Sequence, residues 1–154
     1  MDLRGDSRKR DCVIGYLSAI RRMQREVWGK RDRLEHLKAL AEGMSSVQGQ
    51  SVSGGTRRDL ADIQAQIDEL ADEYAADIER YSRDIAQGYA LCPPTSVPRY
   101  VCWLHWAEGL SWPKVAEKVR YGESHCAHNL CDRGIDEIYE MMPHVWRERG
   151  DLKI

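Results

Sequence analysis

The sequence predicts an all-α protein in which a long antiparallel helical hairpin, with the pattern of a coiled coil, precedes a small three-helix domain. Three observations support this prediction. Two long segments carry apolar side chains at alternating steps of three and four residues. A proline-rich stretch separates them from the remainder of the chain. Charged residues make up 31% of the chain, which fits solvated helices better than strands.

The first long helix is predicted from a heptad seam that begins at Val13 and is sustained over about four repeats. Only Lys30 interrupts the apolar character of this seam, which consists of Val13, Tyr16, Ile20, Met23, Val27, Lys30, Leu34, Leu37, Ala41 and Met44. Residues 43–55 are rich in Gly and Ser and predict a flexible connector.

The second long helix is predicted to begin at Thr56, which can cap it, with Asp59 near its positive end. Its seam comprises Leu60, Ile63, Ile67, Leu70, Tyr74, Ile78, Tyr81 and Ile85. Two successive steps of four meet at Tyr74, which relaxes the local supercoil. Each helix would span about 30 residues, or roughly 45 Å. Matched lengths and one connector predict an antiparallel hairpin over residues 1–87.

The charges of the two helices are complementary. Residues 1–42 carry eleven Lys and Arg against seven Asp and Glu, a net +4, and residues 56–87 carry four against nine, a net −5. Each exposed ion pair contributes only about 0.2–1 kcal/mol. We therefore interpret the basic clusters as a solvated face opposite acidic residues, with a phosphate-binding patch as the alternative; they are Arg21, Arg22, Arg25, Lys30 and Arg31.

A two-helix layer leaves the flanks of both seams exposed, and two hairpins packed as a four-helix bundle would bury more apolar surface. We therefore expect a homodimer. The residues expected to form the dimer contact are Ile20, Val27, Leu34, Leu37, Ile63, Ile67, Leu70 and Tyr74.

Residues 88–98 contain three prolines, which cannot continue a helix, and are predicted to be a linker. Three short helices are predicted beyond it, over residues 99–108, 112–119 and 123–142. A polar tail follows over residues 143–154, in which Trp146 can pack against the rest of the protein. Gly109 stops the first of these helices and Ser111 caps the second, while Gly122 is free to take positive φ in the turn before the third.

The segment Glu108–Val119 is typical of the first helix of a helix-turn-helix, because Val115, Ala116 and Val119 form a short apolar face with a small residue at the crossing point. Over residues 13–142 the chain resembles small phage and prophage proteins whose C-terminal half is similar to region 4 of bacterial sigma factors. The matching residues are Tyr16 to Arg21, Arg99-Tyr100, Glu108 to Trp112, and Val115-Ala116.

This resemblance implies a DNA-binding transcriptional regulator in the cytoplasm of a host cell, with double-stranded DNA as its partner. A dimer would read two half-sites about one helical turn apart, or a multiple of it. The candidate DNA-binding residues are Lys114, Lys118, Arg120, Ser124, His125, His128, Asn129 and Arg133.

The third helix departs from the pattern of such regulators. Its two usual apolar positions fall on Cys126, which suits burial, and on Asn129, which does not, so Leu130 is expected to take over. Residues 99–154 carry eight Lys and Arg against nine Asp and Glu, which is poor for phosphate binding. The alternative is a protein-interaction module that contacts host RNA polymerase or another host protein. A subunit that recognises DNA during packaging, which would need a ring assembly, is the third hypothesis.

No enzymatic chemistry is expected, and no cofactor or metal. Cys102, His105, His128 and Cys131 have ligand-like spacing for zinc, and Cys-His catalysis has the same ingredients, but we prefer a buried Cys126 with exposed histidines. The five cysteines have no framework spacing and are expected to be reduced thiols. Trp103, Trp106 and Trp112 are expected to form a core, with an aromatic partner-binding patch as the alternative. No signal or membrane segment is predicted, so we expect an intracellular protein.

Overall fold

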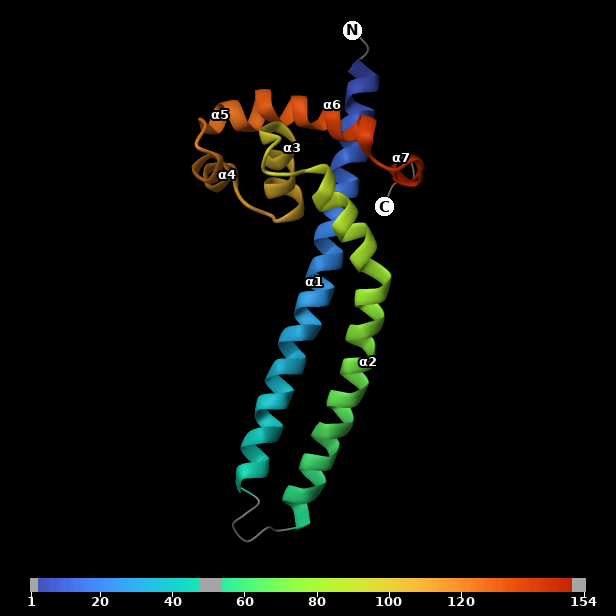
Figure 1. Ribbon diagram of the computed structural model, residues 1–154, viewed down its shortest axis with the longest axis vertical. Helices are drawn as coiled ribbons and strands as arrows, with labels where there is room; N and C mark the ends of the chain where they lie inside the picture. Colours follow the sequence, from blue (N-terminus) through green and yellow to red (C-terminus); the bar gives the residue numbers. More distant parts are fainter. Residues whose placement is uncertain (1–2, 48–53, 151–154) are drawn as a thin grey trace. The chain divides into compact units, whose positions relative to one another are not determined.

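The computed structural model describes residues 3–47 and 54–150, and helices without any strand occupy these ranges (Figure 1). The all-α class predicted from the sequence is confirmed. The chain forms two compact units. The central unit is Gln24–Ser82, and the terminal unit combines Met1–Met23 with Arg83–Ile154. Helices α1 (Leu3–Val47) and α2 (Gly54–Leu91) each contribute to both units.

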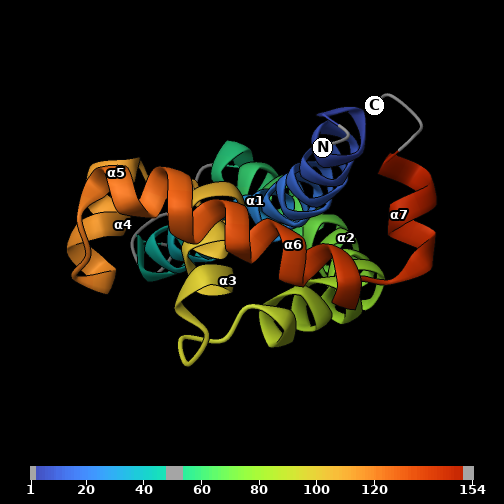
Figure 2. The same ribbon diagram turned by 90° about the horizontal axis from the view of Figure 1, so that it is seen from above.

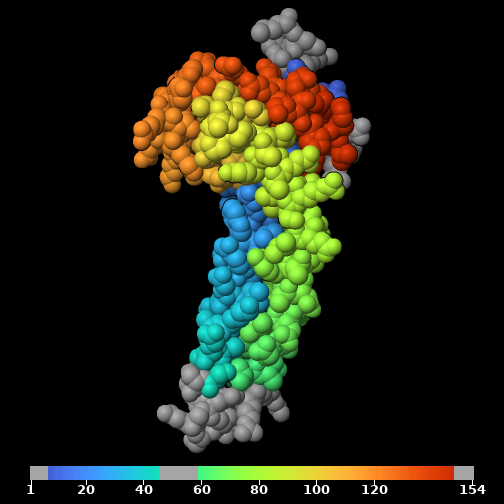
Figure 3. Space-filling view, in the orientation of Figure 1, coloured from blue at the N-terminus to red at the C-terminus, as the bar shows by residue number. Residues whose placement is uncertain are grey.

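In the central unit α1 and α2 run antiparallel and side by side, as the predicted hairpin requires (Figures 1 and 3). Leu34, Ala41 and Ile67 are buried at their contact. Apolar residues around these three are partly buried, namely Leu37, Leu60, Ile63, Leu70, Ala71 and Tyr74. The two predicted seams therefore meet within one chain along this part of the hairpin.

The lysine that interrupts the first seam has a partner on the second helix. Lys30 Nζ lies 2.5 Å from Oδ2 of Asp77, whose side chain is 5% exposed. This hydrogen bond is the main reason that the pKa of Lys30 is raised. The second seam was predicted to continue through Ile78, which is wrong, because Ile78 is exposed and Asp77 takes the inward position. The shift follows the slip in the heptad pattern at Tyr74.

The helices extend further than the sequence predicted. α1 continues through Gly43 to Val47 and α2 begins at Gly54, so both enter the predicted connector at residues 43–55. Residues 48–53 of that connector lie outside the described residues. A helical backbone tolerates the glycines here at a cost of only about 1 kcal/mol each.

The core of the terminal unit is built from both ends of the chain. Val13, Tyr16, Leu17 and Ile20 of α1 are fully buried against apolar residues that lie beyond α2. Those residues are Cys92, Cys102, Trp103, Ala107, Cys131, Ile135, Ile138, Met142 and Trp146. The predicted division at residues 1–87 and 99–142 therefore does not follow the compact units. A heptad seam specifies an apolar helix face but not its partner, and here the first third of the seam packs on the C-terminal helices.

The predicted linker at residues 88–98 is shorter in the structure. α2 continues to Leu91, and α3 (Val97–Cys102) begins one residue before Pro98, which its first turn accepts because a proline there loses no helical hydrogen bond. Arg99 stabilises the turn between α2 and α3. Its side chain donates hydrogen bonds to the carbonyl of Leu91 at 2.7 Å and to Oγ of Ser96 at 3.0 Å.

α3 packs on α6 (Cys131–Met141), which lies over it in Figures 1 and 2. The two backbones approach closely at Gly134. A Cβ added there would overlap the carbonyl oxygen of Pro98 and would lie 2.8 Å from Sγ of Cys102. This contact fixes the helix that carries the candidate site.

The polar tail predicted for residues 143–154 includes a further helix, α7 (His144–Gly150). Trp146 is 9% exposed, and its ring centroid lies 5.3 Å from that of Tyr16. Arg147 donates to the carbonyl of Glu140 at 2.7 Å and lies over the Tyr139 ring. The predicted docking of Trp146 therefore occurs, and it holds a helical tail.

Candidate nucleic-acid interface

The first helix of the predicted helix-turn-helix is α4 (Trp112–Val119), with the predicted bounds. It follows the π-helical turn η1 (Trp103–Ala107), after which the Leu110 N–H donates to the carbonyl of Leu104 at 2.9 Å. Gly109 takes φ +77, which ends the preceding helix as predicted. Ser111 occupies the N-cap position with extended backbone, but its side chain makes no capping hydrogen bond.

A stack of aromatic rings fixes the approach to α4. The His105 ring lies parallel to that of Trp112, with centroids 3.9 Å apart, and Trp106 meets both rings edge-on. His105 Nδ1 lies 2.7 Å from the carbonyl oxygen of Leu110, which can only accept, so Nδ1 carries the proton. Burial lowers the pKa of His105, the hydrogen bond with Leu110 raises it, and the charges of Arg21 and Arg10 lower it. The ring stabilises this turn through its stacking on Trp112 and its hydrogen bond with Leu110.

The tryptophans belong to the core, which favours the core interpretation over an exposed aromatic patch. Trp103 is fully buried, and Trp106 and Trp112 are half-buried against the same apolar clusters. The second of these clusters joins α4 to its neighbours through Val101, Leu104, Val115 and Cys126.

The turn after α4 has its strained residue at Arg120. This residue takes φ 63 and ψ 39, and its N–H donates to the carbonyl of Ala116 at 2.8 Å. Positive φ was predicted at Gly122, which is wrong, because Gly122 has φ −63 and ψ 145. The reason is that the left-handed residue directly follows the last turn of α4, whereas Gly122 stands at the N-cap of the next helix.

The second helix of the motif comprises three continuous segments, α5 (Glu123–His125), η2 (Cys126–Leu130) and α6. Cys126 is fully buried, Leu130 packs on the same apolar cluster, and Asn129 is exposed. Leu130 therefore takes over the apolar position, as expected. The π-helical turn η2 contributes to this outcome, because an extra residue in the turn changes which side chains face inward.

The exposed face of α5 and η2 carries Ser124, His125, His128 and Asn129. His125 and Asn129 are joined by a hydrogen bond of 3.1 Å between Nδ1 of His125 and Nδ2 of Asn129, with the amide nitrogen as the donor. The ring of Tyr121 lies 5.7 Å from that of His125 and is 48% exposed. Tyr121 was not among the predicted DNA-binding residues, although its position in the turn indicated exposure.

The predicted cations differ in how they are engaged. Lys114 and Arg120 are exposed and form no ion pair with any of the described residues. Lys118 lies 3.8 Å from Glu108, and Arg133 lies 3.4 Å from Glu137. Since α4 contacts α5 and η2, six of the eight predicted residues belong to adjoining elements, and Arg120 lies in the turn between α4 and α5. Arg133 lies one segment further, on α6.

The terminal unit is more basic than the C-terminal segment alone. It carries fifteen Lys and Arg against thirteen Asp and Glu, a net +2, because residues 1–23 contribute six against three. Two of these basic residues reach the helix-turn-helix. Arg10 lies 3.4 Å from Asp132 and over the Trp106 ring, and the Arg21 guanidinium lies against Gly109. Neither residue was predicted to lie beside the motif, which is some ninety residues away in the chain.

The cysteines behave as buried thiols. All five are free, and Cys102 Sγ donates to the carbonyl of Cys131 at 3.5 Å. The hydrogen bond with Cys131 and burial raise the pKa of Cys102, and burial raises the pKa of Cys92 to about 12. Within residues 3–47 and 54–150, no group of three His, Cys, Asp or Glu side chains could hold a metal ion. Cys126 belongs to a different apolar cluster from Cys102 and Cys131.

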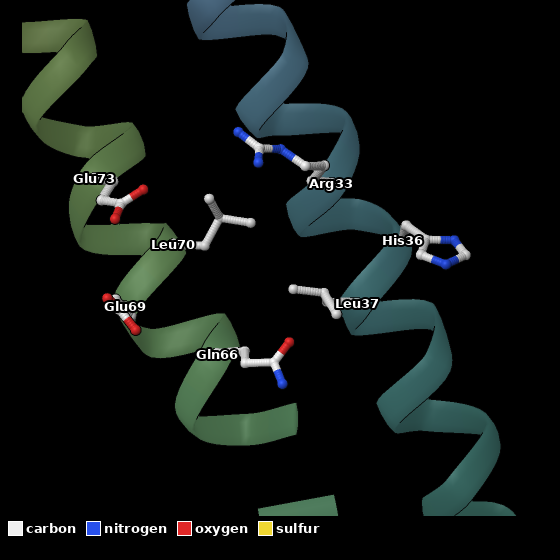
Figure 4. Close-up of a pocket in the computed structure, with 7 residues that line it drawn as sticks. All are labelled: Arg33, His36, Leu37, Gln66, Glu69, Leu70 and Glu73. Atoms are coloured by element: carbon white, nitrogen blue, oxygen red, sulfur yellow. The ribbon is translucent and has the colours of Figure 1, made fainter. Parts of the chain in front are cut away.

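The central unit has an open groove of about 400 Å³ between its two helices. Figure 4 shows Leu37 and Leu70 directed into the space between the helices and His36 directed away from it. Charged side chains of both signs, those of Arg33, Glu69 and Glu73, line the groove together with the polar Gln66.

None of the helices in the described parts of the chain has a stretch long and apolar enough to cross a membrane. Compared with known proteins, the chain matches no family model, no curated protein and no solved structure.

Proposed function

We propose that this protein binds double-stranded DNA as a transcriptional regulator, with α5 and η2 in the major groove. The observation that carries the proposal is the exposed polar face of these segments, which buried Cys126 and half-buried Leu130 hold against α4. In a helix-turn-helix the first residues of the second helix reach the base edges, and the first helix crosses the DNA backbone. The resemblance of Glu108–Trp112 to small phage regulators supports the same role.

The exposed residues divide by chemistry. Ser124, His125, His128 and Asn129 present donors and acceptors that suit base edges. Lys114 and Arg120 are uncommitted cations that suit phosphates. Lys118 adds a third, since its 3.8 Å contact with Glu108 is long and half-exposed. Arg133 is the least suited of the predicted set, because it lies further along the helix and is paired with Glu137.

The test is direct binding of the full chain to labelled DNA fragments from the region upstream of its own gene and from an unrelated sequence. We expect affinity that falls as salt rises, with a tighter site among the upstream fragments. Asn129→Ala should weaken that site by about 1–3 kcal/mol, or roughly 5- to 150-fold, and leave unrelated DNA unaffected. Absence of salt-dependent binding to every fragment contradicts the proposal.

The matched control for Asn129→Ala is Gln64→Ala, which removes an exposed amide from the central unit. The two amides are in similar settings, because each bonds to a side chain four residues away on its own helix. Gln64 Nε2 donates to Asp68 at 3.4 Å, as Asn129 donates to His125. We expect Gln64→Ala to bind both kinds of DNA as the wild-type chain does.

We further propose that two copies associate through the central unit, so that two helix-turn-helix motifs read half-sites one DNA turn apart, about 34–36 Å. The groove supports this, because Leu37 and Leu70 are only partly buried and the charges along it are of both signs. A symmetric contact can place Arg33 of one copy against Glu69 or Glu73 of the other. Of the predicted contact residues, Ile20 is unavailable, since it is fully buried in the terminal unit.

Sedimentation equilibrium tests the dimer. We expect twice the chain mass of 17.7 kDa, and a weaker dimer for Arg33→Glu, which introduces like charges along the groove. Arg31→Glu makes the same change on an exposed residue that does not line the groove and should leave the mass unchanged. A monomeric wild-type chain at micromolar concentration rules the dimer out, and a larger ring would favour the packaging hypothesis.

The second candidate function is a protein-interaction module that contacts RNA polymerase or another host protein. It is favoured by the engagement of polar groups on the exposed face, where Asn129 bonds to His125 and Arg133 pairs with Glu137. Affinity purification from host lysate with and without nuclease separates the two. A stoichiometric protein that survives nuclease supports this candidate, whereas recovery of nucleic acid that nuclease abolishes supports DNA binding.

A further inference from the structure

We propose that Arg21, on the N-terminal helix α1, contacts a DNA phosphate beside the helix-turn-helix. The inference rests on the proposed function and deepens it, because it adds to the interface a residue from outside the motif. Arg21 belongs to the terminal unit together with α4, α5 and η2. It lies some ninety residues before the nearest of the predicted DNA-binding residues in the sequence. The sequence marks it only as a member of the basic clusters, for which a phosphate-binding patch was the alternative to a solvated face.

The position of Arg21 is set by Gly109. A Cβ added to Gly109 would lie 2.5 Å from Cζ of Arg21, 2.6 Å from Nη2 and 2.8 Å from Nε. The plane of the guanidinium is therefore packed against the glycine at the turn that precedes α4. The φ of +77 favours glycine at this position, and a Cβ here would also push the guanidinium away from the turn.

The guanidinium is held there without a polar partner. Arg21 is half-buried and forms no hydrogen bond or ion pair with the described residues. The neighbouring carboxylate is engaged elsewhere, since Glu108 accepts from Trp103 Nε1 at 3.2 Å and lies 3.8 Å from Lys118. A planar guanidinium with unused donors matches the oxygens of a phosphate, and its fixed position lowers the entropy lost on binding.

A second cation lies at the same turn. Lys118 approaches Glu108, and Arg21 approaches the next residue, Gly109. One cation, Lys118, thus lies beside the Glu108 carboxylate, and the other, Arg21, lies beside the backbone of the next residue. Lys118 is on α4, the helix that crosses the DNA backbone in a helix-turn-helix. A phosphate held by α4 would therefore lie within the reach of a cation fixed at the turn before it.

The alternative is that Arg21 only covers the turn and stabilises the fold. A structural role would change the thermal midpoint of unfolding but not the number of ions released on DNA binding. A phosphate contact changes the dependence of affinity on salt, with a slope of about −0.9 in log–log form for each phosphate neutralised. The salt dependence of DNA binding therefore separates the two roles.

The experiment compares Arg21→Gln with Arg22→Gln, a loss of the same charge at the next, exposed position. Dissociation constants are measured for one upstream fragment and one unrelated duplex at KCl concentrations between about 50 and 200 mM. Phosphate contacts dominate the salt dependence in this range. We expect Arg21→Gln to reduce the slope by about 0.9 on both duplexes, which corresponds to roughly eightfold weaker binding at about 0.1 M relative to a 1 M reference. Arg22→Gln should stay within about twofold.

Two outcomes overturn the proposal. One is an unchanged slope for Arg21→Gln, with or without a lowered thermal midpoint, and the other is an equal effect of the two variants on the slope. Arg21→Met, which keeps the apolar stem on the turn, serves as a second neutral variant if the glutamine variant does not unfold cooperatively. If the wild-type chain shows no salt-dependent DNA binding, the proposed function fails and this inference with it. If wild-type binding is intact and the slope of the variants is unchanged, only this inference fails.

Discussion

Arg120 is a single residue at which backbone strain and charge oppose each other. The left-handed backbone conformation of Arg120, with φ 63, costs about 1–2 kcal/mol for a residue with a side chain. Glycine avoids this cost but loses about 0.5–1 kcal/mol, because its unfolded chain has greater conformational entropy. We therefore expect Arg120→Gly to raise the free energy of unfolding by about 0.5–1 kcal/mol. The same change should weaken DNA binding and reduce its salt slope by about 0.9, because a phosphate contact is lost.

Urea unfolding and salt-dependent DNA binding measure the two effects of Arg120→Gly on the same samples. Arg120→Lys is the control, since it keeps both the strain and the charge and should leave stability unchanged. A glycine variant that unfolds at lower urea concentration than the wild-type chain would show that the arginine backbone is not strained. Backbone strain at functional sites commonly lowers the stability of a protein while it positions a side chain for binding.

Lys30 and Asp77 form the second pair of residues with a testable role, in the central unit. Lys30→Met leaves the Asp77 carboxylate, 5% exposed, without its partner, which should lower the free energy of unfolding. The double variant with Asp77→Leu should recover most of that loss, because an apolar pair fits the seam and removes both charges. Chemical denaturation of the two single variants and the double variant gives the coupling. Additive effects would show that the ion pair contributes nothing specific.

At the scale of elements, the approach of α3 to α6 depends on Gly134. Gly134→Ala would place a methyl group against the Pro98 carbonyl and Cys102 Sγ, and we expect a loss of about 1–3 kcal/mol in the free energy of unfolding. Gly15→Ala is the matched control, because Gly15 is also helical and in the terminal unit but has no atom within 4 Å of the added Cβ. That variant should gain about 0.5–1 kcal/mol. Equal changes in the two variants would contradict the close contact.

The helices could be predicted from the sequence, but their partners could not. Apolar periodicity identified α1 and α2, and the signals around Gly109 and Ser111 placed α4 at its observed bounds. Ile20 of the α1 seam packs in the core that contains the C-terminal residues, whereas Leu34 packs on α2. The periodicity cannot predict this change of partner, because both partners offer apolar surface. Helix ends were also missed, since glycine and serine weaken a helix only slightly when neighbouring turns hold it.

The candidate site was predicted in part for similar physical reasons. The burial of Leu130 could be predicted, because the pattern requires an apolar residue near Asn129 and Leu130 is the apolar residue next to it. The strained residue could not be assigned to Arg120, because a nearby glycine usually takes positive φ. Arg21 could not be assigned to the site at all, because its approach to Gly109 depends on tertiary packing.

At the scale of the whole molecule, the first part of α1 helps to build the unit that carries α4, α5 and η2. Tyr16, Leu17 and Ile20 are fully buried in its core, and Trp146 covers Tyr16 from the other end of the chain. Both ends of the chain therefore contribute side chains to the core beneath these helices. This arrangement also brings Arg10 and Arg21 to the candidate interface, which makes the unit net basic.

Two measurements test this dependence on the N-terminal helix. Residues 99–142 alone should show no cooperative thermal unfolding, because the core residues that α1 supplies are missing. In the full chain, Leu17→Ala should cost about 2–5 kcal/mol, because it opens a cavity at a fully buried site of the terminal unit. Leu40→Ala, on the same helix but 44% exposed, should stay within about 0.5 kcal/mol. A cooperative transition in the isolated segment, or a Leu17→Ala variant as stable as Leu40→Ala, would mean that the motif folds without α1 and that Arg21 has no fixed place beside it.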